Sequence, residues 1–397
     1  MTMTHPFDLA ILGAGPSGSS LAITMARHGW RVVLLEKGKM PRDKVCGGFI
    51  GPANHELLEE LGLHEPMRQA GFPILRNLLL SVPRDRSIEI PLEVPGKTTT
   101  AWGVWRREFD ELLVKEARKA GVLVLERTTV SRIENGKINR LFCSEGSCAG
   151  GVIEAAVVVN ASGIDRGQMK GPFHAMGLAA EFENANVPPS QVSVHYAPEG
   201  HCGIDPIGQG RVTVGYVADP VLFERGHKDP AEILALFRQQ NGCLHRMLEG
   251  ARQITPWKGT PIYLVRKFRF FQEGMFHVGD AVGNVNPVGG IGLTLAFQSS
   301  RLLAGLLKRG AAAELSPEAV ARDYERLWRR ELLGRLRMSR FLGKLSHKPF
   351  VAEVMMNIFQ SFPGFLKSAF AQQHAFVYSD PNPRRLVPGP QERHPSL

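Results

Sequence analysis

The sequence contains no long apolar run and few cysteines. No segment of its 397 residues approaches the roughly 20 consecutive apolar residues of a transmembrane helix. The five cysteines are scattered, and no two have the C-x-x-C spacing of a structural zinc site. A glycine-rich turn follows Asp8 almost at once, so we expect no signal peptide. These absences predict a cytoplasmic protein without a metal centre.

Composition and charge exclude further classes. With 43% hydrophobic and 22% charged residues, the chain is too apolar for disorder, and it carries no collagen-like or coiled-coil pattern. Much of the net charge of +10 lies near the C-terminus, where residues 321–397 hold 13 Lys and Arg against 6 Asp and Glu. This basic region lacks the aromatic interleaving and the signatures of nucleic-acid binders, so we expect no nucleic-acid partner.

Strand and helix patterns alternate over most of the chain. Apolar runs at 7–12 and 31–35 are typical of strands buried in a parallel sheet, and a helix pattern lies between them. Residues 172–265 lose this alternation and predict an inserted, mainly antiparallel β region with one helix near 230–240. The alternation returns at 275–278 and is followed by a long helix. The fold class is therefore α/β, a Rossmann-like domain interrupted by a β domain.

A glycine-rich turn joins the first strand to the first helix. Gly13, Gly15 and Gly18 have the spacing that allows a tight turn, backbone approach to a pyrophosphate and close packing of helix on strand. The acidic residue Glu36 ends the second strand, where a carboxylate accepts hydrogen bonds from a ribose. Together these features predict a dinucleotide site at the N-terminus of the helix.

A second glycine-rich block, residues 279–292, follows the late strand. Together with the first turn and the Arg106-x-x-Phe109-Asp110 segment, it resembles the flavin fold shared by para-hydroxybenzoate hydroxylase, the flavin halogenases and the geranylgeranyl reductases. The resemblance implies a glutathione-reductase-type domain that binds FAD in an extended pose, with Arg106 close to the cofactor and Asp280 on its ribityl–phosphate part. The predicted cofactor-binding residues are Gly13, Gly15, Pro16, Ser17, Gly18, Glu36, Lys37, Lys44, Cys46, Gly47, Arg106, Val130, Ser162, Gly163, Gly279, Asp280, Pro287, Gly289, Gly290, Ile291 and Gly292.

The two domains are expected to interleave along the chain. The FAD-binding domain is assigned to 1–80, 105–171 and 266–315, the substrate domain to 81–104 and 172–265, a helical lid to 316–378 and a flexible tail to 379–397.

The loop after the second strand carries a Val-Cys-Gly sequence at Cys46. This segment resembles the geranylgeranyl reductases, in which that cysteine lies beside the isoalloxazine ring. A thiol there is a suitable proton donor to the carbon next to the one that receives a hydride. The alternative is that Cys46 is a small packing residue.

The inserted region departs from that family. Geranylgeranyl reductases line their lipid tunnel with aromatic residues in a segment whose counterpart here holds His201, Gly203 and Asp205. We therefore list His201 and Asp205 with Cys46 as candidate catalytic residues that handle a phenol, enol or quinone oxygen. The alternative is that both polar residues cap a sheet edge or a turn.

Two further departures concern the electron donor and the reaction. Ser162 replaces the Asp of the hydroxylases' Ala-Asp-Gly motif, which contributes to FAD and NADPH contacts there, so NADPH and a separate reductase both remain candidate donors. The halogenase Trp-x-Trp-x-Ile-Pro segment is absent, because Trp102 and Trp105 have the wrong spacing, and halogenation is not expected.

The basic C-terminus predicts an amphipathic helix from Val320 to Leu345, followed by an apolar stretch at 350–370. One interpretation is a lid over the substrate domain. The other is peripheral contact with anionic membrane lipid.

These patterns favour an FAD-dependent oxidoreductase that transfers a hydride from flavin N5 to a double bond of a lipophilic unsaturated, phenolic or quinonoid small molecule. One alternative is a monooxygenase that hydroxylates an aromatic or polyketide-like substrate through a flavin hydroperoxide. Another is a non-catalytic FAD- or lipid-binding protein.

Overall fold

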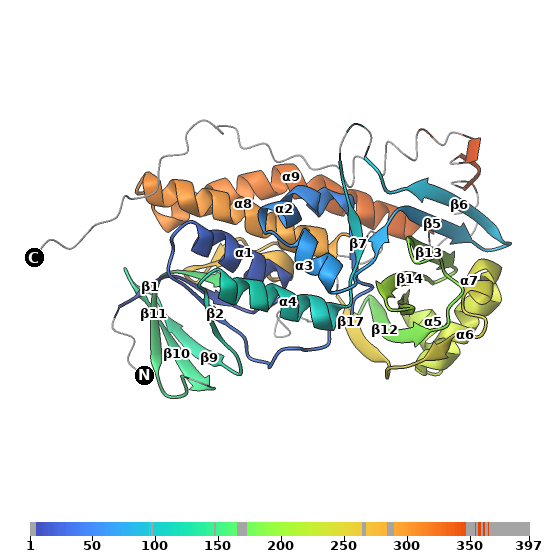
Figure 1. Ribbon diagram of the computed structural model, residues 1–397, viewed down its shortest axis with the longest axis horizontal. Coiled ribbons are helices and arrows are strands. Elements are labelled where there is room, and N and C mark those ends of the chain that lie inside the picture. Colours follow the sequence, from blue (N-terminus) through green and yellow to red (C-terminus); the bar gives the residue numbers. More distant parts are fainter. Residues whose placement is uncertain are drawn as a thin grey trace, which may run out of the picture.

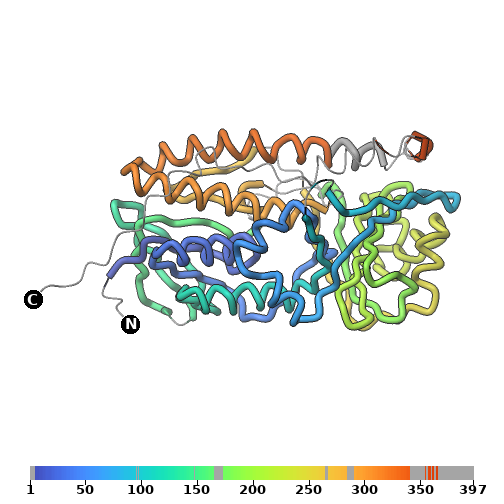
Figure 2. The backbone as a smooth tube through the Cα atoms, turned by 45° about the horizontal axis from the view of Figure 1, so that its top comes forward, coloured from blue at the N-terminus to red at the C-terminus, as the bar shows by residue number. Residues whose placement is uncertain are grey.

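The computed structural model describes residues 5–94, 96, 98–146, 148–164, 173–263, 267–283 and 290–346, with single positions between 354 and 364. The molecule is elongated and has two lobes (Figure 1). One lobe is built on a mostly parallel sheet, the other on an antiparallel sheet, and two long C-terminal helices lie along one side of the first lobe (Figures 1 and 2). The α/β class predicted from the sequence is confirmed.

The first lobe contains the parallel sheet. Its strand order is β18-β19-β11-β1-β2-β8, and the hairpin of β9 and β10 extends it through β11. Strand β2 reads Val-Val-Leu-Leu and is buried along its whole length, as a central parallel strand requires. The bounds are β1 Phe7–Leu12, β2 Val32–Leu35, β8 Leu123–Leu125, β9 Thr129–Glu134, β10 Asn139–Glu145, β11 Val152–Asn160, β18 Phe271–Gln272 and β19 Met275–His277.

Three helices pack against this sheet and one another. They are α1 (Pro16–Arg27), α4 (Arg106–Lys119) and α8 (Gly292–Ala312), and α1 contacts both of the others. Phe109 of α4 meets Phe297 of α8 edge-on, with 6.2 Å between ring centroids. The apolar faces of these helices thus close the core beside the glycine-rich turn.

The second lobe contains the antiparallel sheet, ordered β16-β12-β15-β14-β13-β5-β6 with β17 beside β12. Short helices cover one of its faces, where Tyr216 and Phe237 belong to a separate apolar core. The strands are β5 Asn77–Val82, β6 Arg86–Pro91, β12 Ala175–Glu183, β13 Gln191–Ala197, β14 Gly200–Gly208, β15 Arg211–Ala218, β16 Arg252–Gln253 and β17 Lys258–Ile262, and the helices are α5 Pro220–Arg225, α6 Pro230–Gln240 and α7 Gly242–Met247.

The prediction of a single helix in this region is wrong, because α5 and α7 flank α6. Each has only six residues, too few to produce a periodic apolar pattern. Their cap residues do carry a signal: Asp219 accepts a hydrogen bond from the amide of Leu222, and Asn241 accepts one from Leu244.

A small sheet and three short helices join the lobes. Strand β7 (Ala101–Gly103) lies between β3 (Phe49–Ile50) and β4 (Ile74–Leu75), beside the 3-10 helix η1 (Pro52–Asn54) and the helices α2 (His55–Glu60) and α3 (His64–Gln69). β7 therefore belongs to this connecting sheet, although the sequence assigned residues 81–104 to the substrate domain.

The long helix α9 (Pro317–Ser346) lies alongside α8 (Figure 2). The hydroxyl of Tyr324 donates a hydrogen bond to the carbonyl of His277 at 3.0 Å, which ties α9 to the parallel sheet. Beyond it, Met356 packs against Val82 of the second lobe. Most of the apolar stretch at 350–370 and the whole tail at 379–397 lie outside the described residues. No helix within the described ranges is long and apolar enough to cross a bilayer.

Candidate functional site

The glycine-rich turn between β1 and α1 has two glycines fixed by packing and one that is not. A Cβ at Gly13 would stand 2.6 Å from the carbonyl oxygen of Ala161, and one at Gly18 would collide with the carbonyl oxygen of Gly13. A Cβ at Gly15 would meet only Arg42, at 3.6 Å. The bare backbone at Gly15 therefore faces space that the described protein atoms leave open, at the N-terminus of α1.

Glu36 holds this turn from the end of β2. One carboxylate oxygen accepts a hydrogen bond from the amide of Ala14 at 2.9 Å, and the other accepts one from the amide of Gly38 at 2.9 Å. Both acceptors are used by the backbone, and each carboxylate oxygen keeps a further lone pair. Glu36 thus shapes the turn and remains able to accept a ligand hydroxyl.

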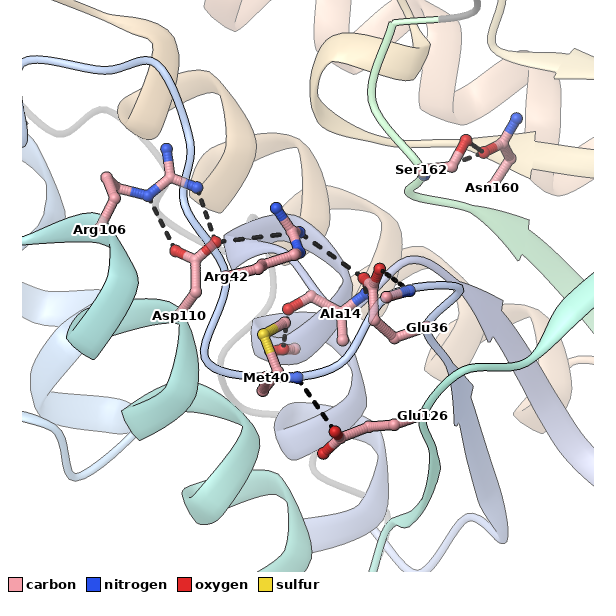
Figure 3. A network of polar contacts seen from close by, with 11 residues as sticks. Ala14, Glu36, Met40, Arg42, Arg106, Asp110, Glu126, Asn160 and Ser162 are labelled. Atoms are coloured by element: carbon pink, nitrogen blue, oxygen red, sulfur yellow. Dashed lines mark hydrogen bonds and ion pairs between the residues drawn. The ribbon is translucent and has the colours of Figure 1, made fainter. Parts of the chain in front are cut away.

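Arg42 was missed by sequence reasoning and lies beside Gly15. Its Nη2 stands 3.6 Å from the Glu36 carboxylate and 3.9 Å from Asp110, and Figure 3 shows the guanidinium between the two acids. In the part of the chain that the structure describes, its buried Nε has no partner. A buried donor without an acceptor beside an open backbone turn is suited to an anionic ligand. The loop after β2 gave no pattern that would have singled it out.

Arg106 forms a buried, bidentate ion pair with Asp110. Its Nε and Nη2 donate to the two carboxylate oxygens at 2.8 and 2.9 Å (Figure 3). Burial opposes the charge, but Asp110 and the Cys46 sulfur raise the pKa of Arg106 above its ordinary value. The guanidinium therefore stays charged and fixed beside Cys46, and Arg106 is not an exposed surface charge.

Lys44 and Asp280 bring the second glycine-rich block to this cluster. Desolvation raises the pKa of Asp280, and Lys44 and Arg106 oppose that rise. Desolvation also lowers the pKa of Lys44, partly offset by Asp280. The Lys44 ammonium lies 4.0 Å from the position that a Cβ would take at Gly163. Residues from three distant chain segments thus meet around one charge cluster.

The start of α8 supplies further open backbone. A Cβ at Gly292 would meet nothing within 4 Å, whereas one at Gly290 would approach Phe49 at 3.2 Å. Ile291 is buried, and the amide of Gly279 donates to Ser299 at 2.8 Å, which anchors the block to α8. The predicted ligands Pro287 and Gly289 lie outside the described residues.

The remaining predicted cofactor residues differ in position and in the contacts they make. Pro16 and Ser17 begin α1, and the Ser17 carbonyl accepts a hydrogen bond from Ser300. Lys37 is exposed, and Val130 packs against the β10–β11 side of the sheet. Ser162 donates its amide and hydroxyl to Asn160 (Figure 3). Cofactor contact stays a prediction for each of the predicted site residues, and for Lys37, Val130 and Ser162 no described contact adds to it.

Comparison with known proteins identifies the ligand that this cluster suits. The family model described as "FAD binding domain" matches residues 7–140. Menaquinone reductase of Mycolicibacterium smegmatis is 23% identical over 352 residues, covering 80% of this chain and 81% of that protein. Digeranylgeranylglycerophospholipid reductase 1 of Methanopyrus kandleri is 28% identical over 334 residues, covering 80% and 82%. The solved structure of the myxobacterial chondrochloren halogenase CndH superposes with a TM-score of 0.74 at 27% identity, covering 85% and 82%.

The chain is an FAD-dependent oxidoreductase. Its sequence and fold match those of the superfamily of flavin monooxygenases, flavin halogenases and geranylgeranyl reductases. The observed residues fit the cofactor: open backbone at Gly15 and Gly292, the orphaned donor of Arg42, and a helix N-terminus with no acidic residue in its first turn. These groups match a pyrophosphate and a partly anionic ring, while Glu36 suits a ribose.

In this oxidoreductase, the antiparallel sheet lies on the other side of the Cys46 loop. A Cβ at Gly47 would collide with Oδ2 of Asp205, so the Asp205 carboxyl lies directly against the loop. Asp205 is only 6% exposed, and burial raises its pKa to about 7. The structure thus brings two of the three candidate catalytic residues, Cys46 and Asp205, to neighbouring positions.

His201 lies on the same sheet face as Asp205, four residues away along β14 and next to the Tyr196 ring at 6.2 Å. That spacing separates the two by about 13 Å along the strand. The alternative in which His201 and Asp205 cap a sheet edge is wrong, because β14 pairs on both sides, with β13 and β15. The register of a central strand cannot be read from one sequence.

Polar contacts connect the Cys46 loop, between β2 and β3, to the antiparallel sheet. These contacts were not predicted from the sequence. Asp43 of the loop pairs with Lys258 of β17 at 2.8 Å and with Arg107 of α4 at 3.4 Å. Arg211 of β15 stacks on the Trp105 ring at 4.4 Å. These contacts join residues far apart in the sequence and hold the loop between the lobes.

Proposed function

We propose that the enzyme reduces a double bond in a lipophilic unsaturated, phenolic or quinonoid small molecule. The observation that carries this proposal is the buried Asp205 carboxyl against Gly47, one residue from Cys46, on the loop that borders the cofactor cluster. Relatives of comparable length carry the names menaquinone reductase and digeranylgeranylglycerophospholipid reductase, which supports reduction.

The protein's own groups then handle protons and orientation. Reduced FAD, when bound, would supply one hydride, which carries both electrons of the reduction, to one atom of the double bond. The Asp205 carboxyl or the Cys46 thiol would donate a proton to the other atom, which completes the reduction. With a pKa of about 7, Asp205 is partly protonated at neutral pH and suits this task. Arg106 fixes Cys46 and favours negative charge developing beside it.

We propose that the described C-terminal residues act as a lid. Met356 is 3% exposed and packs against Val82 beside Ile88 and Tyr196. Arg86 of β6 donates to Asn357 and Gln360 at 2.5 and 2.7 Å. These contacts support the lid interpretation, and contact with a membrane stays a prediction.

Reduction can be tested by following bound FAD after anaerobic photoreduction. We expect 1,4-naphthoquinone to reoxidise the protein-bound cofactor with a rate that saturates as the quinone concentration rises, whereas free reduced FAD gives a rate that rises linearly. Geranylgeranyl diphosphate serves as an unsaturated, non-quinonoid probe, and NADPH added anaerobically to oxidised protein tests direct reduction. If every probe reacts without saturation, the proposed substrate class is wrong.

Oxygenation is the second candidate, because a group with the raised pKa of Asp205 is also able to accept the proton of a phenol and so activate its ring. Reduced protein mixed with O₂ and 1-naphthol distinguishes the two reactions. A hydroxylated naphthol in the mass spectrum supports oxygenation, and stoichiometric hydrogen peroxide without that product supports reduction.

Replacement of Cys46 tests its role as a proton donor. Cys46→Ser is expected to retain FAD and to slow double-bond reduction about 10- to 100-fold, because a hydroxyl is a much weaker acid than a thiol. The measurement is single-turnover reoxidation of the reduced protein, with Cys243→Ser on α7 as the matched control. Equal rates in Cys46→Ser and wild type would make Cys46 a packing residue.

A further inference from the structure

Two glycines stand opposite each other in the middle of the antiparallel sheet. Gly203 of β14 and Gly215 of β15 are paired in the register. A Cβ at Gly203 would meet nothing closer than 3.6 Å, and one at Gly215 nothing closer than 3.7 Å. Neither residue has a positive φ. The protein's own packing and backbone would therefore accept alanine at both positions. Glycine is unexpected here, because it weakens a strand.

The glycines are the centre of a row that crosses four strands. Ala179 of β12, Gly215, Gly203 and Val194 of β13 are successive partners and share one face of the sheet; we call this row the glycine strip. Gly215, Gly203 and Val194 are half-exposed although their strands are central. The helices α5–α7 pack on the opposite face, so the glycine strip faces away from that core.

A mostly buried acid, Asp205, lies between the Cys46 loop and the glycine strip. Oδ2 of Asp205 lies 3.8 Å from the position of a Cβ on Gly203, and the residue is 6% exposed. Among the described residues it has no hydrogen-bond or ion-pair partner. A buried carboxyl without a partner is costly unless a ligand or water satisfies it.

The two sides of the glycine strip differ in polarity. On the side of the Cys46 loop, Glu181, Thr213 and Asp205 form the adjoining row of the same face. On the other side the corresponding row holds Gly177, Val217, His201 and Tyr196. The strip thus has one border with two acids and one border without an acid.

One end of the glycine strip is apolar. Val194 pairs with Leu80 of β5, which pairs with Ile88 of β6. Met356 of the C-terminal segment covers Ile88 and Tyr196 at this end. A chain leaving the strip here would pass over aliphatic side chains and beneath the lid.

We propose that the glycine strip is the seat of a flat ring whose oxygen substituents face Asp205 and Thr213 and whose aliphatic chain leaves over Leu80 and Ile88. The missing side chains of Gly203 and Gly215 make room for the ring, and the Asp205 carboxyl exchanges hydrogen bonds with its oxygens. This inference rests on the proposed function and narrows its substrate to a phenol or quinone with an apolar tail.

The test measures binding of 1-naphthol and 4-octylphenol to the oxidised holoenzyme through the change in FAD absorption. Gly203→Ala and Gly215→Ala are expected to weaken both probes about 10-fold and Gly203→Val about 100-fold, since each added methyl occupies ring space. Gly259→Ala on β17 is the matched control, because its Cβ would lie 3.7 Å from Leu178 on the opposite face, and its affinities stay at the wild-type value.

Thermal unfolding of the ligand-free holoenzyme shows whether the glycine variants lose binding because ring space is filled or because the fold is destabilised. The two alanine variants are expected to melt at or above the wild-type temperature, because alanine suits a strand better than glycine. Leu80→Gln is expected to remove the advantage of 4-octylphenol over phenol and to leave phenol binding unchanged. Unaltered affinity of Gly203→Val for 1-naphthol overturns the proposal.

The binding readout also separates this inference from the proposed reaction. If the wild type binds the probes and the glycine variants do not, but no quinone is reduced, the ring site stands and the reaction is wrong. If neither probe perturbs the wild-type spectrum up to its solubility limit, the ring site is wrong, even where reduced enzyme still transfers electrons to another acceptor.

Discussion

Gly15→Val is expected to yield a folded, colourless protein, whereas the wild type purifies yellow and releases FAD on denaturation. The valine side chain would fill the space beside α1 in which the described structure offers only Arg42 at 3.6 Å. A pyrophosphate must approach the bare backbone there, so we expect FAD affinity to fall by about 100-fold or more. The measurement is the FAD-to-protein ratio after purification and after reconstitution with excess FAD.

Two variants show whether the loss is local. Thr24→Val places a valine in the same helix, away from its N-terminus, and is expected to keep full FAD content. Gly13→Val is expected to fail by misfolding, because its side chain would collide with the backbone of Ala161. A yellow Gly15→Val protein with a full complement of FAD would remove the turn from the cofactor site.

Asp205→Asn is expected to have the largest effect on turnover. An amide cannot deliver the proton, so the rate of reduction should fall about 100-fold or more while FAD content is unchanged. Wild-type turnover is expected to decline as pH rises through about 7, where burial has placed the pKa of this carboxyl, and the variant should lack that decline. Asp85→Asn, at an exposed carboxylate of the same lobe, is the control.

The same substitution has a signature in stability. Burial raises the pKa of Asp205 from 3.8 to about 7, so between these values the folded protein holds one more proton than the unfolded chain. The unfolding free energy therefore falls as pH rises from about 4 to about 7, by about 4 kcal/mol in total for this group, and is level above that range. Asp205→Asn should be stabilised relative to wild type more at pH 8 than at pH 4. A pH-independent difference between the two proteins would show that Asp205 titrates normally.

The cofactor half of the site was predictable because its signals are local. The turn at Gly13–Gly18 lies directly between a strand and a helix, and Glu36 ends the next strand, so sequence spacing alone relates them. Arg42 escaped detection because its position follows from an irregular loop that has no period. Its importance is visible only through Gly15 and Asp110, which lie 27 and 68 positions away in the sequence.

For the substrate side of the site, the sequence predicted which residue types take part but not where they lie. His201 and Asp205 were selected for their chemistry, but their location in a central strand depends on pairing with β13 and β15, which one sequence does not specify. The helices α5 and α7 were missed although Asp219-Pro220 and Asn241 are recognisable helix starts. Short helices gain most of their stability from tertiary packing, so their periodicity is weak.

The path of the chain between the lobes has a consequence for biosynthesis. The parallel sheet takes strands from before and after the antiparallel sheet in the sequence. Its β11–β19 pairing needs Met275–His277, which the ribosome adds only after the whole antiparallel sheet. Neither lobe is a continuous segment, so neither can be cut out as one stretch of the chain. The nascent chain cannot complete its parallel sheet until His277 of its 397 residues has been added. We therefore expect FAD to be acquired late in translation or after release.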